Sequence, residues 1–125
     1  MPNIPFHKPI TPKDLNQIYT ESMKSGWLTT GPEVRKFESK LQNILKAEHV
    51  IAVNSCTAAL HLALCSKGFN KNDKFIAPTY TFVATVEVGE YLGMDCILID
   101  SSENDFNMDL NQIEDKLIND SKIKV

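Results

Sequence analysis

The sequence is poor in the features that mark nucleic-acid-binding and membrane proteins. It contains one arginine, Arg35, and scattered lysines, and its net charge is −3, so no basic surface for nucleic acid is expected. No stretch reaches the roughly 18 apolar residues that cross a bilayer. The first ten residues lack the basic and apolar blocks of a secretion signal. These absences predict a cytoplasmic protein that binds neither nucleic acid nor a membrane.

Cysteine and histidine are also scarce. The three cysteines, Cys56, Cys65 and Cys96, are odd in number, far apart and free of any CxxC spacing. This usage is typical of reduced thiols and does not fit a disulfide framework or a zinc site. The three histidines lack metal-ligand spacing as well. We therefore expect no metal.

The first part of the chain predicts an extended arm and two helices. Three prolines among the first nine residues favour an extended arm. Thr11 and Pro12 then predict the N-cap and the first residue of a helix, which Gly26 ends. After a loop, Pro32 opens a second helix with apolar residues at helical spacing. The predicted division is residues 1–31, which contain the arm, the first helix and the loop, and residues 32–125.

Short apolar runs alternate with helical segments from about residue 50 onward. The runs are continuously apolar, as expected of parallel strands covered on both faces. Alternation of this kind predicts an α/β protein with three strand–helix units. The predicted strands are Val50–Val53, Phe75–Ala77 and Cys96–Ile99, and the helices are 57–67, 81–92 and a last helix capped by Asp109.

The final residues, 122–125, look like the start of a fourth strand. A buried strand that stopped there would leave the backbone groups of its neighbour unpaired. The sequence therefore predicts the front part of a longer protein.

A polar triplet, Ser55-Cys56-Thr57, separates the first apolar run from a helical segment. In an open parallel sheet, a helix that begins beyond a strand presents unpaired N–H groups and a partial positive charge to anions, phosphate especially. The hydroxyls of Ser55 and Thr57 add donors, and Cys56 is small enough to admit phosphate to the backbone. A single polar residue would suffice to cap the helix. Phosphate binding and capping are thus two interpretations of the triplet.

Both common nucleotide-binding loops, GxGxxG and GxxxxGK[ST], are absent. A different phosphorylated cofactor, pyridoxal phosphate, needs an aromatic surface against its ring. Tyr80 and Phe82 follow the second predicted strand and supply aromatics at the same edge of the sheet. The alternative is that Phe82 packs in the core.

Two further candidates are weaker. Cys56 could be a reactive thiolate at a helix N-terminus, but no histidine is placed by sequence to act as its base. Asp100 ends a strand, where carboxylates are commonly turn or cap residues. Neither is predicted to be catalytic.

Four ordered blocks of the sequence resemble the DegT/StrS family of sugar aminotransferases, in the family's order and with similar spacing. The blocks are SGWLTTGPEVRKFESKL at 25–41, AVNSCTAALHLAL at 52–64, APTYTFVATVEVGEYLG at 77–93 and ILIDSSENDFNMD at 97–109. The resemblance implies the aspartate aminotransferase-like fold of pyridoxal-phosphate enzymes, fold type I. Residues 32–125 would be the front part of its large, cofactor-binding domain.

The resemblance also implies roles for individual residues. Cys56 and Thr57 would hold the cofactor phosphate through backbone N–H groups and the Thr57 hydroxyl, Ser55 would shape the turn, and Phe82 would stack on the pyridine ring. The substrate side of the pocket would be formed by Phe6 and His7 of the arm and by Trp27, Thr29 and Thr30 of the loop.

The implied activity is transfer of an amino group, with glutamate as donor, to a keto sugar linked to a nucleotide diphosphate, in the synthesis of amino sugars for a surface polysaccharide or glycan. A homodimer is implied for the whole enzyme. The lysine that forms the Schiff base would lie beyond Val125, so residues 1–125 alone would be inactive. Two alternatives stay open: an inert remnant or partial subunit that needs a complementary chain, and a sugar dehydratase of the same family.

Overall fold

The computed structural model describes residues 3–125 and divides into two compact units, one ending at Ala52 and one comprising Val53–Val125. Met1 and Pro2, which begin the predicted arm, lie outside the described residues. From Asn3 to Ile10 the arm forms no helix or strand and its side chains are exposed. No helix among the described residues is long and apolar enough to span a membrane.

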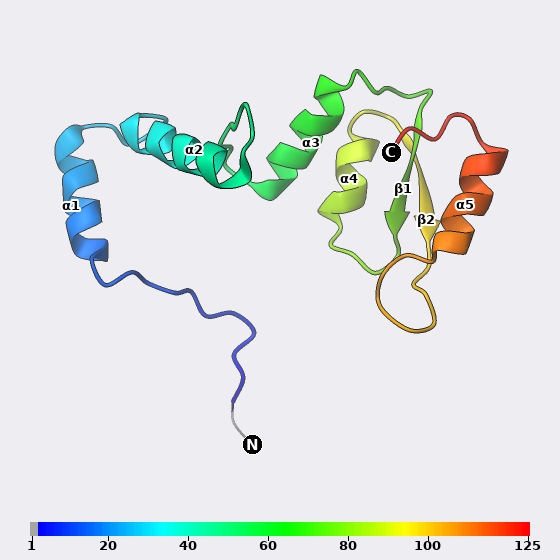
Figure 1. Ribbon diagram of the computed structural model, residues 1–125, viewed down its shortest axis with the longest axis horizontal. Coiled ribbons are helices and arrows are strands. Elements are labelled where there is room, and N and C mark those ends of the chain that lie inside the picture. The colour runs from blue at the N-terminus through cyan, green and yellow to red at the C-terminus, as the bar shows by residue number, and fades with distance from the viewer. Residues whose placement is uncertain (1–2) are drawn as a thin grey trace. The chain divides into compact units, whose positions relative to one another are not determined.

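The first unit contains two helices, α1 (Leu15–Ser25) and α2 (Pro32–Leu45) (Figure 1). Gly26 ends α1 in the left-handed conformation at φ 73°, which glycine adopts without steric cost. Pro32 is the first residue of α2, as predicted. The prediction of Thr11 as the N-cap of α1 is wrong. The Leu15 N–H donates to the carbonyl oxygen of Pro12 at 3.3 Å, so a tighter turn precedes the helix.

The predicted strand Val50–Val53 is irregular in the structure. A strand exists only where its backbone groups pair with a neighbour, and no neighbouring strand lies beside this segment among residues 3–125. Instead, the Ala52 N–H donates to the Glu38 carboxylate at 2.8 Å. The first of the three predicted strand–helix units therefore lacks its strand here.

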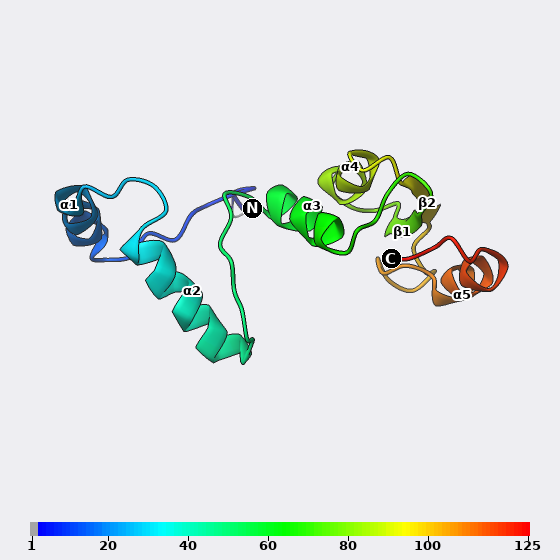
Figure 2. The ribbon, with the colours of Figure 1, turned by 90° about the horizontal axis from the view of Figure 1, so that it is seen from above.

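The second unit is built on two parallel strands, β1 (Lys74–Pro78) and β2 (Asp95–Ile99), with Phe75 paired to Cys96. Both strands fall where the apolar runs predict them. The strands lie between helices α4 (Ala84–Glu90) and α5 (Leu110–Asn119), and α3 (Cys56–Ser66) packs on α4 (Figures 1 and 2).

The boundaries of α4 differ from the prediction of 81–92. At its start, the Thr85 N–H donates to the Phe82 carbonyl at 3.0 Å, so a tighter turn leads into the helix. At the other end, the Gly93 N–H donates to the Glu90 carbonyl at 2.8 Å, and Gly93 turns the chain at φ 72°. The helix is shorter than predicted because both ends are occupied by turns.

The core of this unit lies between α4 and the sheet. Phe75 and Ala77 of β1 pack with Met94, and all three are buried. At Gly89 the helix comes so close to β1 that the Phe75 ring fills the space where a side chain would stand. This contact sets how closely α4 approaches β1.

The segment predicted to start a fourth strand runs parallel to β1, on the edge away from β2. The Lys124 N–H donates to the Lys74 carbonyl at 2.9 Å, and the Ile76 N–H donates to the Val125 carbonyl at 2.7 Å. The Lys74 ammonium also bonds the Asp120 carboxylate at 2.7 Å. Asp120 additionally accepts from the Lys122 N–H at 2.9 Å. The ion pair therefore ties the last residues to β1.

The stability of this attachment should depend on pH. The hydrogen bond from Lys74, followed by that from the Lys122 N–H, holds the pKa of Asp120 below its ordinary value, and the same pair raises the pKa of Lys74. A carboxylate with a depressed folded pKa stabilises the protein above about pH 4 and loses that contribution as the pH falls through the folded value. The raised pKa of Lys74 keeps its contribution intact up to about pH 10.

Urea unfolding at pH 7 and at pH 3 tests this dependence. The unmodified protein should lose more stability between the two pH values than Asp120→Asn, whereas Glu114→Gln, an exposed change on α5, should behave like the unmodified protein. Equal acid losses in Asp120→Asn and in the unmodified protein would contradict the role of the pair.

Candidate functional site

The start of α3 is an open helix N-terminus. Ser55 is its N-cap, in extended conformation, and its hydroxyl oxygen accepts from the Ala58 N–H at 3.1 Å. The Ser55 carbonyl accepts from the Ala59 N–H at 3.1 Å. The helix consequently begins at Cys56, one residue before the predicted start, because the cap directs the chain into helical geometry there.

Two backbone donors remain available at this terminus. Among residues 3–125, neither the Cys56 N–H nor the Thr57 N–H donates to a protein acceptor. Cys56 is exposed and Thr57 is half-buried, so packed side chains do not cover the corner. The partial positive charge of an 11-residue helix adds to these donors. The arrangement fits a phosphate dianion.

The capping role of Ser55 is compatible with anion binding. Its oxygen is occupied as an acceptor by the Ala58 N–H, but its hydroxyl hydrogen can still be donated. Capping therefore uses one residue of the triplet and leaves Cys56 and Thr57 without a structural partner. Holding of phosphate by these residues stays a prediction.

Phe82 lies in the loop between β1 and α4, and its side chain is 76% exposed. The alternative in which Phe82 packs in the core is therefore wrong, because the core is formed by Phe75, Ala77 and Met94. No hydrogen bond or aromatic pair joins Phe82 to the start of α3 within the described part of the chain. The ring is free to accept a planar ligand, and stacking on a cofactor stays a prediction.

The predicted substrate-side residues all belong to the first unit. Trp27 and Thr29 line a hollow of about 180 Å³ beside the start of α2. Thr30 does not line it, and Phe6 and His7 are exposed in the arm. The structure brings together two of these five residues.

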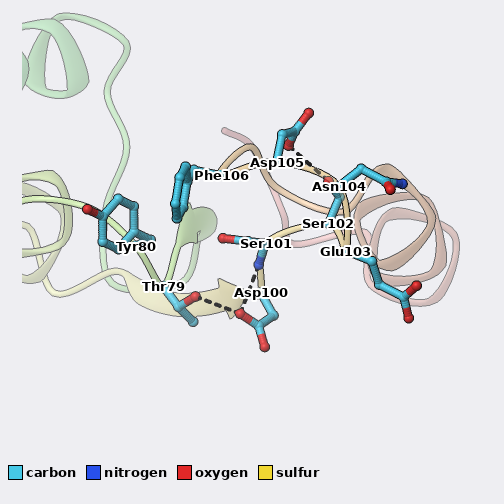
Figure 3. A pocket seen from close by; sticks show the side chains of 9 residues that line it. All are labelled: Thr79, Tyr80, Asp100, Ser101, Ser102, Glu103, Asn104, Asp105 and Phe106. Carbon is cyan, nitrogen blue, oxygen red and sulfur yellow. Dashed lines mark hydrogen bonds between the residues drawn. The ribbon is translucent and has the colours of Figure 1, made fainter.

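A larger hollow, of about 560 Å³, lies at the carboxyl ends of β1 and β2 (Figure 3). Tyr80 follows β1, Asp100 follows β2, and Phe106 comes from the loop beyond it. Sequence reasoning placed Asp100 among turn residues, and the structure gives it that role: it accepts from the Thr79 hydroxyl at 3.1 Å and from the Ser101 N–H at 2.8 Å. Sequence reasoning missed this hollow, because no local signal shows that the loops of Tyr80 and Phe106 lie at one edge of the sheet.

The remaining polar groups form no further centre. Cys56, Cys65 and Cys96 are free thiols, and burial, followed by the charge of Glu90, raises the pKa of the Cys96 thiol. Within residues 3–125, no three side chains of cysteine, histidine, aspartate or glutamate gather as metal ligands would.

Comparison with known proteins gives consistent matches. A family model described as the DegT/DnrJ/EryC1/StrS aminotransferase family matches residues 9–123. The chain is 39% identical over 111 residues to the spore coat polysaccharide biosynthesis protein SpsC of Bacillus subtilis, a match that covers 89% of this chain and 28% of that protein. It is 32% identical over 123 residues to GDP-perosamine synthase of Escherichia coli O157:H7, covering 98% of this chain and 34% of the relative.

Solved structures give the same result. The putative sugar aminotransferase Spr1654 of Streptococcus pneumoniae, in its PLP form, superposes with a TM-score of 0.90 at 30% identity and covers 98% of this chain and 31% of that chain. Its PMP form superposes with the same TM-score. The chain spans between 28% and 34% of the length of these relatives.

Proposed function

The chain belongs to the DegT/DnrJ/EryC1/StrS aminotransferase family, and we propose that it provides the phosphate-holding part of an aminotransferase that acts on keto sugars linked to a nucleotide diphosphate. The predicted fold class is confirmed: the structure has the α/β fold of the matching part of fold type I enzymes. The predicted cofactor, pyridoxal phosphate, is confirmed for the family. The observation that carries the proposal is the open start of α3, with two unpartnered N–H groups.

Different residues of the second unit would bind different parts of the cofactor. The N–H groups of Cys56 and Thr57 and the Thr57 hydroxyl would hold the phosphate, while Ser55 keeps the turn in shape. The exposed Phe82 ring would lie against the pyridine ring and exclude water from one of its faces. When bound, pyridoxal phosphate supplies the electron sink for moving an amino group. The chain's own contribution is anchoring and orientation.

The family resemblance also suggests the amino donor, the residues that face the substrate and the assembly of the whole enzyme. Glutamate would be the amino donor, Phe6, His7, Trp27, Thr29 and Thr30 would face the sugar substrate, and the whole enzyme would be a cytoplasmic homodimer in amino-sugar biosynthesis. Two relatives support the placement in amino-sugar biosynthesis, since one is a polysaccharide biosynthesis protein and another is a GDP-perosamine synthase.

A polypeptide of residues 1–125 should show no transaminase activity by itself. By its resemblance to the family, the Schiff-base lysine would lie beyond Val125, and the chain spans about a third of the length of its relatives. Incubation with pyridoxal phosphate, glutamate and a nucleotide-linked keto sugar should yield no amino sugar above the level of the free cofactor. Enzymatic turnover by this polypeptide would contradict the proposal.

The second candidate function is that of a partial subunit which needs a complementary chain. The irregular Val50–Val53 segment favours it, because its backbone groups find no neighbouring strand among residues 3–125. Size-exclusion chromatography and hydrogen exchange distinguish a domain that folds alone from a partial subunit. A self-sufficient domain should be monodisperse with slow exchange in β1 and β2, whereas a partial subunit should exchange fast until its partner is added.

A further inference from the structure

The orientation of α3 in its unit depends on side-chain packing. Among residues 3–125, no hydrogen bond or ion pair joins residues 56–66 to another helix or strand. No residue of α3 is fully buried. Apolar packing is non-directional, so burial alone does not fix the tilt of the helix. The direction in which the open start of α3 points must therefore be set by the few side chains that contact the rest of the unit.

One face of α3 makes these contacts. Thr57, His61 and Leu64 are half-buried, and their spacing of four and three residues places them on one face of the helix. Leu64, in the second half of α3, packs against the core. His61 lies between this anchor and the open start, about 7.5 Å along the helix axis from Cys56 at 1.5 Å per residue. A contact at His61 therefore limits how far the open start can swing about Leu64.

The His61 ring meets the ring of Tyr91. The two centroids lie 5.5 Å apart and the planes are inclined by 72°, an edge-to-face arrangement. Such a pair is directional, because an aromatic ring has a negative face and a positive edge. Within the described part of the chain, no other aromatic pair joins α3 to a different segment. The pair thus supplies the angular preference that apolar packing lacks.

Tyr91 is held firmly on the side of α4. It directly follows that helix, and its N–H donates to the Glu87 carbonyl at 2.9 Å. Two residues earlier, Gly89 lies against the Phe75 ring, and the next residue, Leu92, packs against the core. The Tyr91 ring itself is largely exposed, so it is not part of that core. Its backbone is fixed on both sides, and its ring offers α3 a stationary contact.

We propose that the His61–Tyr91 pair positions the open start of α3, so that the N–H groups of Cys56 and Thr57 point at one anion. This inference rests on the proposed function, in which the anion is the cofactor phosphate. A hydrogen bond weakens steeply as its donor turns away from the acceptor, so two donors hold one phosphate only when both are aimed at it. His61 and Tyr91 are positioning residues, since they act through the direction of α3.

Amide NMR titration with pyridoxamine 5′-phosphate, followed at Thr57, tests the proposal. Tyr91→Leu and His61→Leu each remove one ring of the pair and should weaken binding about three- to tenfold. Tyr91→Phe keeps the ring and should restore binding to within about twofold of the unmodified protein. The matched control is Tyr19→Leu on α1, because Tyr19 is 63% exposed and Tyr91 60%. This control should bind as the unmodified protein does.

Urea unfolding of the same variants distinguishes positioning from stabilisation. A pair that only stabilised the unit would lower the free energy of unfolding in Tyr91→Leu and leave the dissociation constant of the folded protein unchanged. Equal affinity of Tyr91→Leu and Tyr91→Phe would overturn the proposal. Weakening by Tyr19→Leu to the same extent as by Tyr91→Leu would overturn it too.

Should the leucine variants fail to fold, the unmodified protein decides. Its His61 and Tyr91 ring protons should show a nuclear Overhauser effect that persists when pyridoxamine 5′-phosphate is bound, and its absence in the bound protein would overturn the proposal. If the unmodified protein shows no saturable shift at Thr57, the proposed function itself fails. If it shows that shift and Tyr91→Leu binds equally tightly, only the positioning role fails.

Discussion

Replacing Gly89 with alanine should destabilise residues 53–125 by about 2 kcal/mol. The new methyl group would lie 2.9 Å from Cδ1 of Phe75 and closer still to two other atoms of the ring. The ring is 4% exposed and packed against Ala77 and Met94, so it cannot move aside without disturbing the core. Overpacking costs about 1–3 kcal/mol, and a clash with three ring atoms belongs at the upper end. The helix propensity of alanine offsets about 1 kcal/mol.

A double-mutant cycle isolates the clash from other effects of the substitution. Phe75→Leu removes the ring, so Gly89→Ala should cost much less in that background than in the unmodified protein. Urea unfolding of the four proteins gives the coupling free energy. An equal cost of Gly89→Ala in both backgrounds would show that the Phe75 contact does not limit the approach of α4 to β1.

Local signals in the sequence predict most of the second unit. The apolar runs at 75–77 and 96–99 become β1 and β2, and Asp109 caps α5 by accepting from the Asn111 N–H at 2.9 Å. These features depend on a few neighbouring residues, which the sequence displays directly. The error at Val50–Val53 has the opposite cause, because an apolar run becomes a strand only when a partner lies beside it.

In the candidate site, too, features that depend on neighbouring residues are predictable and features that depend on distant segments are not. The polar triplet predicts an open helix start because a cap and its free N–H groups are local to one segment. The larger hollow at the carboxyl ends of β1 and β2 could not be predicted in the same way. Tyr80 and Phe106 belong to different loops, and only the parallel pairing of β1 with β2 brings those loops to one edge. Phe82 is exposed, although phenylalanine side chains are usually buried.

Removing a single backbone donor at the start of α3 should weaken phosphate binding about tenfold or more. Cys56→Pro does this with little harm to the helix, because proline is favoured at the first helical position and lacks the N–H. Ser55 already has φ −157° and ψ 157°, an extended conformation that the residue before a proline tolerates. Cys56→Ala removes the thiol but keeps the N–H, and it is the matched control.

The central claim is that the N–H groups of Cys56 and Thr57 grip the phosphate of the cofactor, and amide NMR titration with pyridoxamine 5′-phosphate tests it most directly. This probe has no aldehyde that could react with surface lysines. The account predicts saturable shifts of the Thr57 amide in the unmodified protein and in Cys56→Ala, about tenfold weaker binding in Cys56→Pro, and none with pyridoxamine, which has no phosphate. Equal binding by Cys56→Pro and Cys56→Ala, or shifts that appear equally with pyridoxamine, would contradict it.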